Sequence, residues 1–573
     1  MEKTLSLKKF KNSRLFIFFF YLSAVAFFCL ELNSYKYLVG IPFALITLHF
    51  VLKKFDLCKE LEASSKMKIY AALSTAGVCL NGVHNFYFLR ILDEQKCPLS
   101  RLRDLIYAKG IDVNMYKAVF ACVAVAGAVV GFLFCYALVL FLCKRLWQII
   151  KQNDLISFSR AERIVNGTIF ALYAVLVCFA YFKSEAFYYT RCDILLGSDT
   201  NSVIVSNNNF VAHGYRAPIS HALFGTFSIP FFGITSLVSN IFPFRQAVPL
   251  LAVFTNIALL IFASHILLNA FNFSTLERIL GMILVCCTYP HIFNGINLET
   301  YVVSFFYVAL FLNCYIKTKK TNTLALYGAT GVLFTSCAAA IFTVEPSLRQ
   351  DFKKYIQTLF KLAGGFILIL VVLCRLDVFL EIILDPKYYG QWMGSARGLS
   401  FSARFLQYLE SVPYFFTFPT ARVMNISAHT DRNGIFWQAY TAYLVPEVFK
   451  ANVLGIVILV LCAVSTIVNR KDKLAQFSFF WCVFTFIVTC VIGWGEDGQV
   501  SDVKTFCLQL YSLYFGWAYF VLLVLLVKKA AEVLKFRALV AIAFVLSTVA
   551  LLYVNIPQAI RMLKFCFEYY PLR

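Results

Sequence analysis

The chain has 573 residues, of which 60% are apolar and 14% are charged, and its mean hydropathy is +0.74. Ordinary soluble domains are about half apolar and about a quarter charged, so this composition excludes a soluble enzyme and predicts an integral membrane protein. In such a chain the net charge of +22 indicates cytoplasmic loops that follow the positive-inside rule, and it does not indicate a nucleic-acid partner.

Segments of about 20 apolar residues, the length that crosses the hydrocarbon core, recur along the whole chain. The clear ones are 14–32, 37–52, 68–89, 117–143, 164–182, 248–270, 300–316, 357–374, 451–468, 475–494, 508–527 and 538–555. Three others are predicted to be broken or paired short helices because proline, glycine or polar residues interrupt them: 219–242 with Pro230, 279–295 with Pro290, and 322–345. We expect an all-α polytopic fold of twelve to fifteen transmembrane or broken helices.

Clusters of lysine and arginine between the spans predict sidedness. They lie at 3–14, 53–68, 144–163, 317–320, 349–354, 470–473 and 528–537. The positive-inside rule assigns these clusters, and the N-terminus, to the cytoplasm. The remaining connections then face outward: 90–116, 184–218, 376–450 and 495–506.

The long loop 376–450 is neutral, with six acidic and six basic residues from Asp377 to Lys450. It contains amphipathic pieces such as ARFLQYLESVPYFFTF, which predict helices lying in the membrane interface. For the chain as a whole we expect a four-span N-terminal addition over 1–160, a transmembrane core over 161–555 with outer loops 184–218 and 376–450, and a C-terminal tail over 556–573.

The polar stretch that follows the fifth span, CDILLGSDTNSVIVSNNNFVAHGYRAPISH, holds two candidate acids. Asp199 is expected at the membrane surface, where partial desolvation gives a carboxylate the raised proton affinity of a general base. Alternatively, Asp199 caps a helix that begins at Thr200. Asp193 is a second candidate for the general base, or it forms a local ion pair with Arg191.

The same stretch ends on Arg216, Pro218 and His221. Proline fits the first turn of a helix, so a helix is expected to begin at Pro218, with Arg216 and His221 near the surface. The forked N–H donors of the arginine guanidinium and the free amides at the helix start are suited to a phosphate. The alternatives are an arginine that reaches lipid headgroups and a histidine whose hydrogen bonds are satisfied within the protein. For His221 alone, the second interpretation is favoured.

Other candidate substrate-binding residues lie further along the chain. Glu299 opens an apolar span, a position typical of functional acids but also favourable to the helix dipole. Arg397, Arg404 and Arg422, with His429 nearby, are able to bind a phosphate, or to pair with the acids of the loop or with headgroups. No Cys/His spacing fits a zinc site, so the sequence predicts no metal ligands and no cofactor, and it leaves a divalent cation open.

As a whole, this pattern resembles the GT-C superfamily of polytopic glycosyltransferases, which includes protein O-mannosyltransferases and lipid A aminoarabinose transferases. The resemblance covers about 160–555 and rests on an early outer-loop Asp, the Arg-x-Pro-x-x-His entry at 216–221, the Glu at 299, broken helices and a long interfacial loop. It implies an active site at the outer membrane face and transfer of a sugar from a polyprenyl-phosphate carrier, with Asp199 as catalytic base. The chain departs from the pattern in that four additional spans precede the span leading into this loop, and Thr200 replaces a second acid.

The expected function is therefore sugar transfer from a polyprenyl-phosphate carrier to a glycan, lipid or protein acceptor, at the outer face of a bacterial plasma membrane. Asp199 or Asp193 would act as base, and Arg216, His221, Glu299, Arg404 and Arg422 would bind substrate. Two alternatives remain. An O-antigen-type polymerase or ligase would use the arginines and His429 of the long loop, whereas a transporter or flippase would place charges at mid-membrane and show internal symmetry.

Overall fold

The structure is a computed structural model of the whole chain. It describes residues 14–30, 35–54, 61–84, 108–110, 113–188, 194–196, 221–241, 247–376, 400–426, 429–430, 436–437, 441–446, 453–493 and 511–572. These residues are helical apart from four short strands, which confirms the predicted all-α fold. The chain divides into a first unit (1–156, 205–252 and 323–385) and a second unit (157–204, 253–322 and 386–573).

The first unit contains α2 (Arg14–Leu30), α3 (Tyr35–Lys54), α5 (Ser65–His84), α7 (Val113–Gln152), α10 (Phe224–Ile241), α15 (Thr323–Val332), η5 (Phe334–Cys337), α16 (Ala338–Thr343), α17 (Glu345–Gln350) and α18 (Phe352–Val372). Helix α11 (Ala247–Leu268) begins in this unit and continues into the second.

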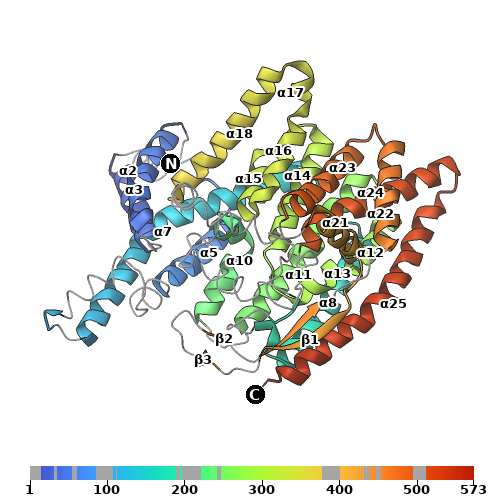
Figure 1. Cartoon of the computed structure of the whole chain (residues 1–573). Helices are drawn as coiled ribbons and strands as arrows, with labels where there is room; N and C mark the ends of the chain where they lie inside the picture. The colour runs from blue at the N-terminus through green and yellow to red at the C-terminus, as the bar shows by residue number, and fades with distance from the viewer. Residues whose placement is uncertain are drawn as a thin grey trace. The chain divides into compact units, whose positions relative to one another are not determined.

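The second unit contains α8 (Arg160–Lys183), η2 (Ala186–Tyr188), η4 (Asn269–Phe271), α12 (Thr275–Cys286), α13 (Tyr289–Ile296), α14 (Tyr301–Thr318), α21 (Phe401–Ser411), η6 (Val412–Phe415), β1 (Ala421–Ile426), β2 (His429–Thr430), β3 (Phe436–Trp437), β4 (Thr441–Pro446), α22 (Val453–Val468), α23 (Lys473–Phe486), η7 (Ile487–Val491), α24 (Ser512–Val533) and α25 (Ala538–Tyr569). Figure 1 labels most of these elements.

Among the described residues, nine helices are long and apolar enough to cross a membrane, or ten if the bent pair α12 and α13 is counted as one broken span. Three shorter apolar helices, Phe16–Cys29, Val39–Lys53 and Val453–Val468, accompany them. The predicted polytopic membrane protein is therefore confirmed. The last helix, α25, runs past the expected span end at 555 and continues to Tyr569.

The three predicted interruptions turn out differently. The stretch 322–345 is broken: α15 ends at Val332, Leu333 is extended with φ −142°, and η5 and α16 follow. The stretch 219–242 is not broken, because α10 continues through Pro230. Helix α5 packs directly on α10 here, where a Cβ on Gly233 would lie 2.5 Å from the Cβ of Ser74, and Tyr70 donates to the Pro230 carbonyl. This close packing accommodates the proline without a break.

In the second unit, the basic helix junctions meet at one end, which we call the basic end. The contacts that show this are Glu162 with Arg278, Lys528 with the Phe271 carbonyl, and Asn313 with the Ile266 carbonyl. They join the starts of α8 and α12 to the ends of α11, α14 and α24. Helices in this unit therefore begin and end alternately at the basic end, as the lysine and arginine clusters predict. The positive-inside rule predicts that the basic end faces the cytoplasm.

The opposite end, which we call the distal end, gathers the other helix termini. Glu185 N–H donates to the Tyr570 carbonyl at 3.0 Å, so α8 and α25 finish together. The rings of Tyr301 and Tyr511, at the starts of α14 and α24, are 5.3 Å apart. The outer loop that carries the candidate acids therefore leaves α8 at the distal end.

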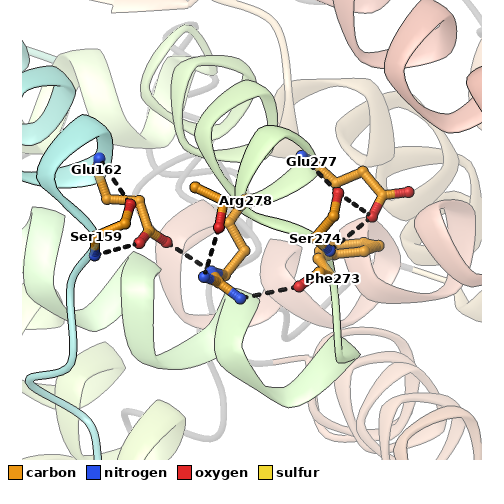
Figure 2. A network of polar contacts seen from close by, with 7 residues as sticks. Ser159, Glu162, Phe273, Ser274, Glu277 and Arg278 are labelled. Atoms are coloured by element: carbon orange, nitrogen blue, oxygen red, sulfur yellow. Dashed lines mark hydrogen bonds and ion pairs between the residues drawn. The ribbon is translucent and has the colours of Figure 1, made fainter.

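Two capping boxes lie side by side at the basic end (Figure 2). Ser159 and Glu162 cap α8, and Ser274 and Glu277 cap α12, each with reciprocal side-chain and backbone hydrogen bonds. Arg278 Nε lies 2.6 Å from Glu162 Oε1 and joins the two helix starts. The Glu162 side chain is 4% exposed, so this ion pair is well shielded from water.

We expect Glu162→Gln to lower the free energy of unfolding by about 1–3 kcal/mol, because it leaves Arg278 without its charged partner in a partly buried place. Glutamine preserves a capping box, so the loss reports the ion pair. The control is Glu277→Gln, because Glu277 has no ion pair among the described residues. Denaturant titration of the detergent-solubilised protein measures both, and equal losses would contradict the prediction.

The predicted break in 279–295 is present, since α12 and α13 meet at an angle of 67°. Pro290 lies in the first turn of α13, where a proline fits. The backbone groups freed by the break are paired from elsewhere: Asn555 Nδ2 donates to the Cys287 carbonyl at 2.8 Å, and Tyr289 N–H donates to the Phe416 carbonyl at 2.8 Å. Irregular backbone is tolerated at membrane depth only when it is paired in this way.

The long loop is more mixed than expected. Its predicted amphipathic helix exists as α21 followed by η6, and Tyr408 and Leu409 are buried. The strands were not predicted: β1 and β4 pair antiparallel over six residues each, and β2 pairs with β3. Alternating residues such as those of TAYLVP form a strand here because a neighbouring strand supplies backbone partners.

Candidate functional site

The predicted site residues are distributed over both units. His221 belongs to the first unit, and Glu299, Arg404 and Arg422 belong to the second. Asp193, Asp199 and Arg216 lie outside the described residues, as does Arg397. The candidate site is therefore built from the distal end of the second unit and from the short described piece Ile194–Leu196.

That piece lies between the two candidate acids in the sequence, and it is anchored on β4. Leu196 N–H donates to the Leu444 carbonyl at 2.8 Å, and Leu444 N–H donates to the Ile194 carbonyl at 3.0 Å, as in a parallel bridge. Leu195 and Leu444 are 1% and 2% exposed, so the junction is well packed. Asp193 directly precedes this anchored piece and Asp199 follows three residues after it.

Arg422 lies on β1, the strand paired with the other edge of β4. Its register partner is Val445, and the next pair is Val423 with Leu444. Neighbouring strands are about 4.8 Å apart, so β1 runs about 10 Å from the Ile194–Leu196 piece. The Arg422 Nε is buried and has no hydrogen-bond acceptor among the described residues. A buried guanidinium donor of this kind is suited to an anionic oxygen.

The ends of α8 and α25 support this hairpin. Tyr570 O–H donates to the Ala442 carbonyl of β4 at 2.5 Å. Ser184, just after α8, donates to the Cys566 carbonyl at 2.9 Å and to the Tyr570 carbonyl at 2.7 Å. Figure 1 shows β1 beside the C-terminal end of α25 (red). The hairpin with Arg422 is therefore held on transmembrane helices.

Glu299 lies between α13 and α14 and is 2% exposed. It makes polar interactions of its own and lies close enough to Tyr289 to act on it electrostatically. A carboxylate buried at the distal end of a span is a costly feature that is often functional.

Arg404 lies on α21 and is tied to the end of α23. Its Nη1 donates at 3.1 Å to the carbonyl of Val491, the last residue of the π-helical turn η7 that follows α23. The carbonyl groups at a helix C-terminus lack partners within the helix, and an arginine satisfies them. The Nε of Arg404 is buried without an acceptor among the described residues. Arg404 thus has a structural role and retains one donor.

His221 has a structural role in the first unit. Its Nδ1 lies 2.7 Å from the Val332 carbonyl oxygen, and Leu223 N–H donates to the Gly331 carbonyl at 2.8 Å, so the turn before α10 is fastened to α15. Burial lowers the pKa of His221, and the hydrogen bond to Val332 only partly opposes this. The ring is therefore neutral at pH 7, in agreement with the satisfied-histidine interpretation.

A small cavity lies at the break between α12 and α13 and has a volume of about 20 Å³, enough for one water molecule. Its walls include Thr288, His291, Phe305, Phe415, Phe416, Ser512, Trp517 and Phe520. His291 Nε2 contacts Ser264 Oγ at 2.8 Å and its Nδ1 contacts Thr288 Oγ1 at 3.0 Å, so both ring nitrogens are engaged. The volume is far below that of a ligand pocket, so we assign this cavity to internal water.

The sequence did not single out Asn555 or Ser512 for a role. Asn555 is a polar residue in the middle of an apolar helix, and such residues in spans usually have a specific partner. That signal marks it as important but does not identify Cys287 and Phe416 as its acceptors.

Within the described residues, no group of three His, Cys, Asp or Glu side chains is placed to hold a metal ion. No family model matches the chain, and comparison with curated proteins and with solved structures finds no match either.

Proposed function

We propose that this multi-span membrane protein is a glycosyltransferase that moves a sugar from a polyprenyl-phosphate carrier to an acceptor at the distal end of its second unit. One observation carries the proposal. The piece Ile194–Leu196, which lies between Asp193 and Asp199 in the sequence, is hydrogen-bonded to β4, whose other edge pairs with the strand of Arg422. Residues adjacent in sequence to a candidate base and a candidate phosphate ligand thus belong to one small sheet.

The chemistry is a displacement at the anomeric carbon. The acceptor hydroxyl attacks this carbon while Asp199 takes its proton, and the bond from the anomeric carbon to the phosphate oxygen breaks. The leaving polyprenyl phosphate keeps the electron pair, and Arg422 stabilises its charge. Charge-assisted hydrogen bonds of this type are the strong ones, more so where water is excluded.

The location also supports the proposal. The distal end is opposite the basic end, so the positive-inside rule predicts that it is not cytoplasmic. A polyprenyl carrier keeps its tail in the bilayer and its phosphate at the surface. The support of the β1–β4 hairpin by α8 and α25 keeps Arg422 next to the spans.

The test is an assay of the purified protein in liposomes with labelled polyprenyl-phosphate sugars. A transferase releases polyprenyl phosphate and gives a labelled acceptor. A polymerase instead lengthens a lipid-linked chain, and a flippase moves the donor across the bilayer without cleaving it. Intact donor after incubation with every sugar and acceptor class tested would contradict the proposal.

For the leaving group, we expect Arg422→Lys to lower the turnover number about 10–100-fold, because lysine cannot reproduce the forked donors of arginine. The control is Arg163→Lys at the basic end, an exposed arginine for which no change is expected. Initial rates of polyprenyl phosphate release measure both variants. If Arg422→Lys behaves like wild type while Arg404→Ala is inactive, the phosphate site belongs to α21 and not to β1.

A further inference from the structure

Helices α11 and α13 carry buried oxygen atoms that have no hydrogen-bond donor. Asn256 of α11 and Asn294 of α13 are each 1% exposed, and Tyr289 of α13 is fully buried. The Oδ1 atoms of both asparagines and the hydroxyl of Tyr289 lack a hydrogen-bond partner among the described residues. Buried polar atoms are nearly always paired, so each such atom calls for an explanation.

The orientation of the two amides follows from their nitrogen atoms. Asn256 Nδ2 donates to the Asn294 carbonyl at 2.8 Å and reaches the Asn297 carbonyl at 3.5 Å. Asn294 Nδ2 donates to the Pro290 carbonyl at 2.7 Å. Exchanging oxygen and nitrogen in either amide would set two acceptors against each other. The unpaired atoms are therefore acceptor oxygens in both residues.

The Asn256 amide lies at the C-terminal end of α13, because its Nδ2 reaches the carbonyls of Asn294 and Asn297. Helix α13 ends at Ile296, whose carbonyl accepts from Tyr181 O–H at 3.2 Å. The C-terminal end of a helix carries partial negative charge and favours a cation. Glu299 follows three residues later and is 2% exposed, so its carboxylate adds negative potential nearby.

We propose that the end of α13 binds a monovalent metal cation, Na⁺ or K⁺, through Asn256 Oδ1, Asn294 Oδ1 and neighbouring oxygen atoms. Hard cations take oxygen ligands, and Ca²⁺ or Mg²⁺ sites usually include several carboxylates. The orphaned oxygens here are neutral amide and hydroxyl groups, which match a single positive charge. The inference is independent of the proposed sugar transfer.

The first test uses thermal unfolding of the purified full-length chain in detergent, with NaCl, KCl, choline chloride or MgCl₂ at constant ionic strength. We expect Na⁺ or K⁺ to raise Tm saturably, by about 2 °C or more over choline. The comparison of Na⁺ with K⁺ identifies the ion. Equal Tm values in all salts, or a rise with Mg²⁺ alone, would overturn the proposal.

The second test uses variants with a matched control. Asn256→Ala is expected to abolish the dependence of Tm on Na⁺ or K⁺, and Asn294→Ala is expected to abolish or weaken it, because each variant removes one of the two amide oxygens. The control is Asn313→Ala, which removes a buried amide that donates to the Ile266 carbonyl at the basic end. It should lower Tm but keep the cation effect. A cation effect that survives both Asn256→Ala and Asn294→Ala would refute the assignment.

Discussion

Asp199→Asn is expected to lower sugar transfer from a labelled polyprenyl-phosphate donor about 10³-fold or more, with normal expression and Tm. Asparagine has nearly the shape of aspartate but cannot accept the proton of the attacking hydroxyl, and general bases contribute about 10²–10⁴-fold. The rate of acceptor labelling in proteoliposomes measures the effect. The pH profile should also change, because removal of the base removes the acidic limb of the profile.

Asp154→Asn is the matched control for this variant. Asp154 is exposed and has φ 51°, a backbone conformation that asparagine also tolerates, so neither activity nor folding should change. Asp193→Asn separates the two candidate acids. If Asp193→Asn is inactive and Asp199→Asn retains wild-type turnover, the base is Asp193 and the role carried over from the family resemblance is wrong for Asp199.

Gly455→Ala is expected to cost about 3 kcal/mol of unfolding free energy, the largest effect on stability. Gly455 of α22 lies against the backbone of α21, where a Cβ would overlap the Leu409 carbonyl oxygen and lie 3.0 Å from the carbonyl carbon. A backbone group cannot rotate away as a side chain does, so α21 must shift. Because α21 carries Arg404, the hydrogen bond to the Val491 carbonyl should weaken as well.

The control for Gly455→Ala is Gly167→Ala in α8. A Cβ at Gly167 meets nothing within 4 Å, so alanine should be neutral or slightly stabilising through its better helix propensity. Denaturant titration in detergent compares the two. Similar stabilities of the two variants would show that α21 does not pack against α22 at this glycine.

The membrane spans follow from local patterns of the sequence. Runs of about 20 apolar residues identify them, and clusters such as those at 317–320 and 470–473 predict which helix ends share a side. The break at Pro290 was also predictable, because proline and polar residues interrupt the run. Pro230 shows the limit of this reasoning, since the same residue type leaves α10 unbroken where α5 packs closely against it.

Of the candidate site, Glu299 was identified because it opens an apolar span, and Arg422 because it is one of the arginines of the long loop. The β1–β4 hairpin was not, and neither was the attachment of Ile194–Leu196 to Leu444, about 250 residues further along the chain. Strand pairing depends on the partner as much as on the strand, so short apolar pieces in a loop do not reveal it.

The residue sequence is sufficient for the membrane class, the approximate spans and, in the second unit, the common end of the basic junctions. The reason is that the bilayer selects on apolar length and charge, which are properties of each segment alone. The tertiary structure settles which distant groups complete each break. Asn555 donates to the carbonyl of Cys287, which lies 268 positions earlier in the sequence. Asn256 of α11 donates to the carbonyl of Asn294 in α13. A donor finds its acceptor only through the packing of whole helices, and no local pattern encodes that pairing.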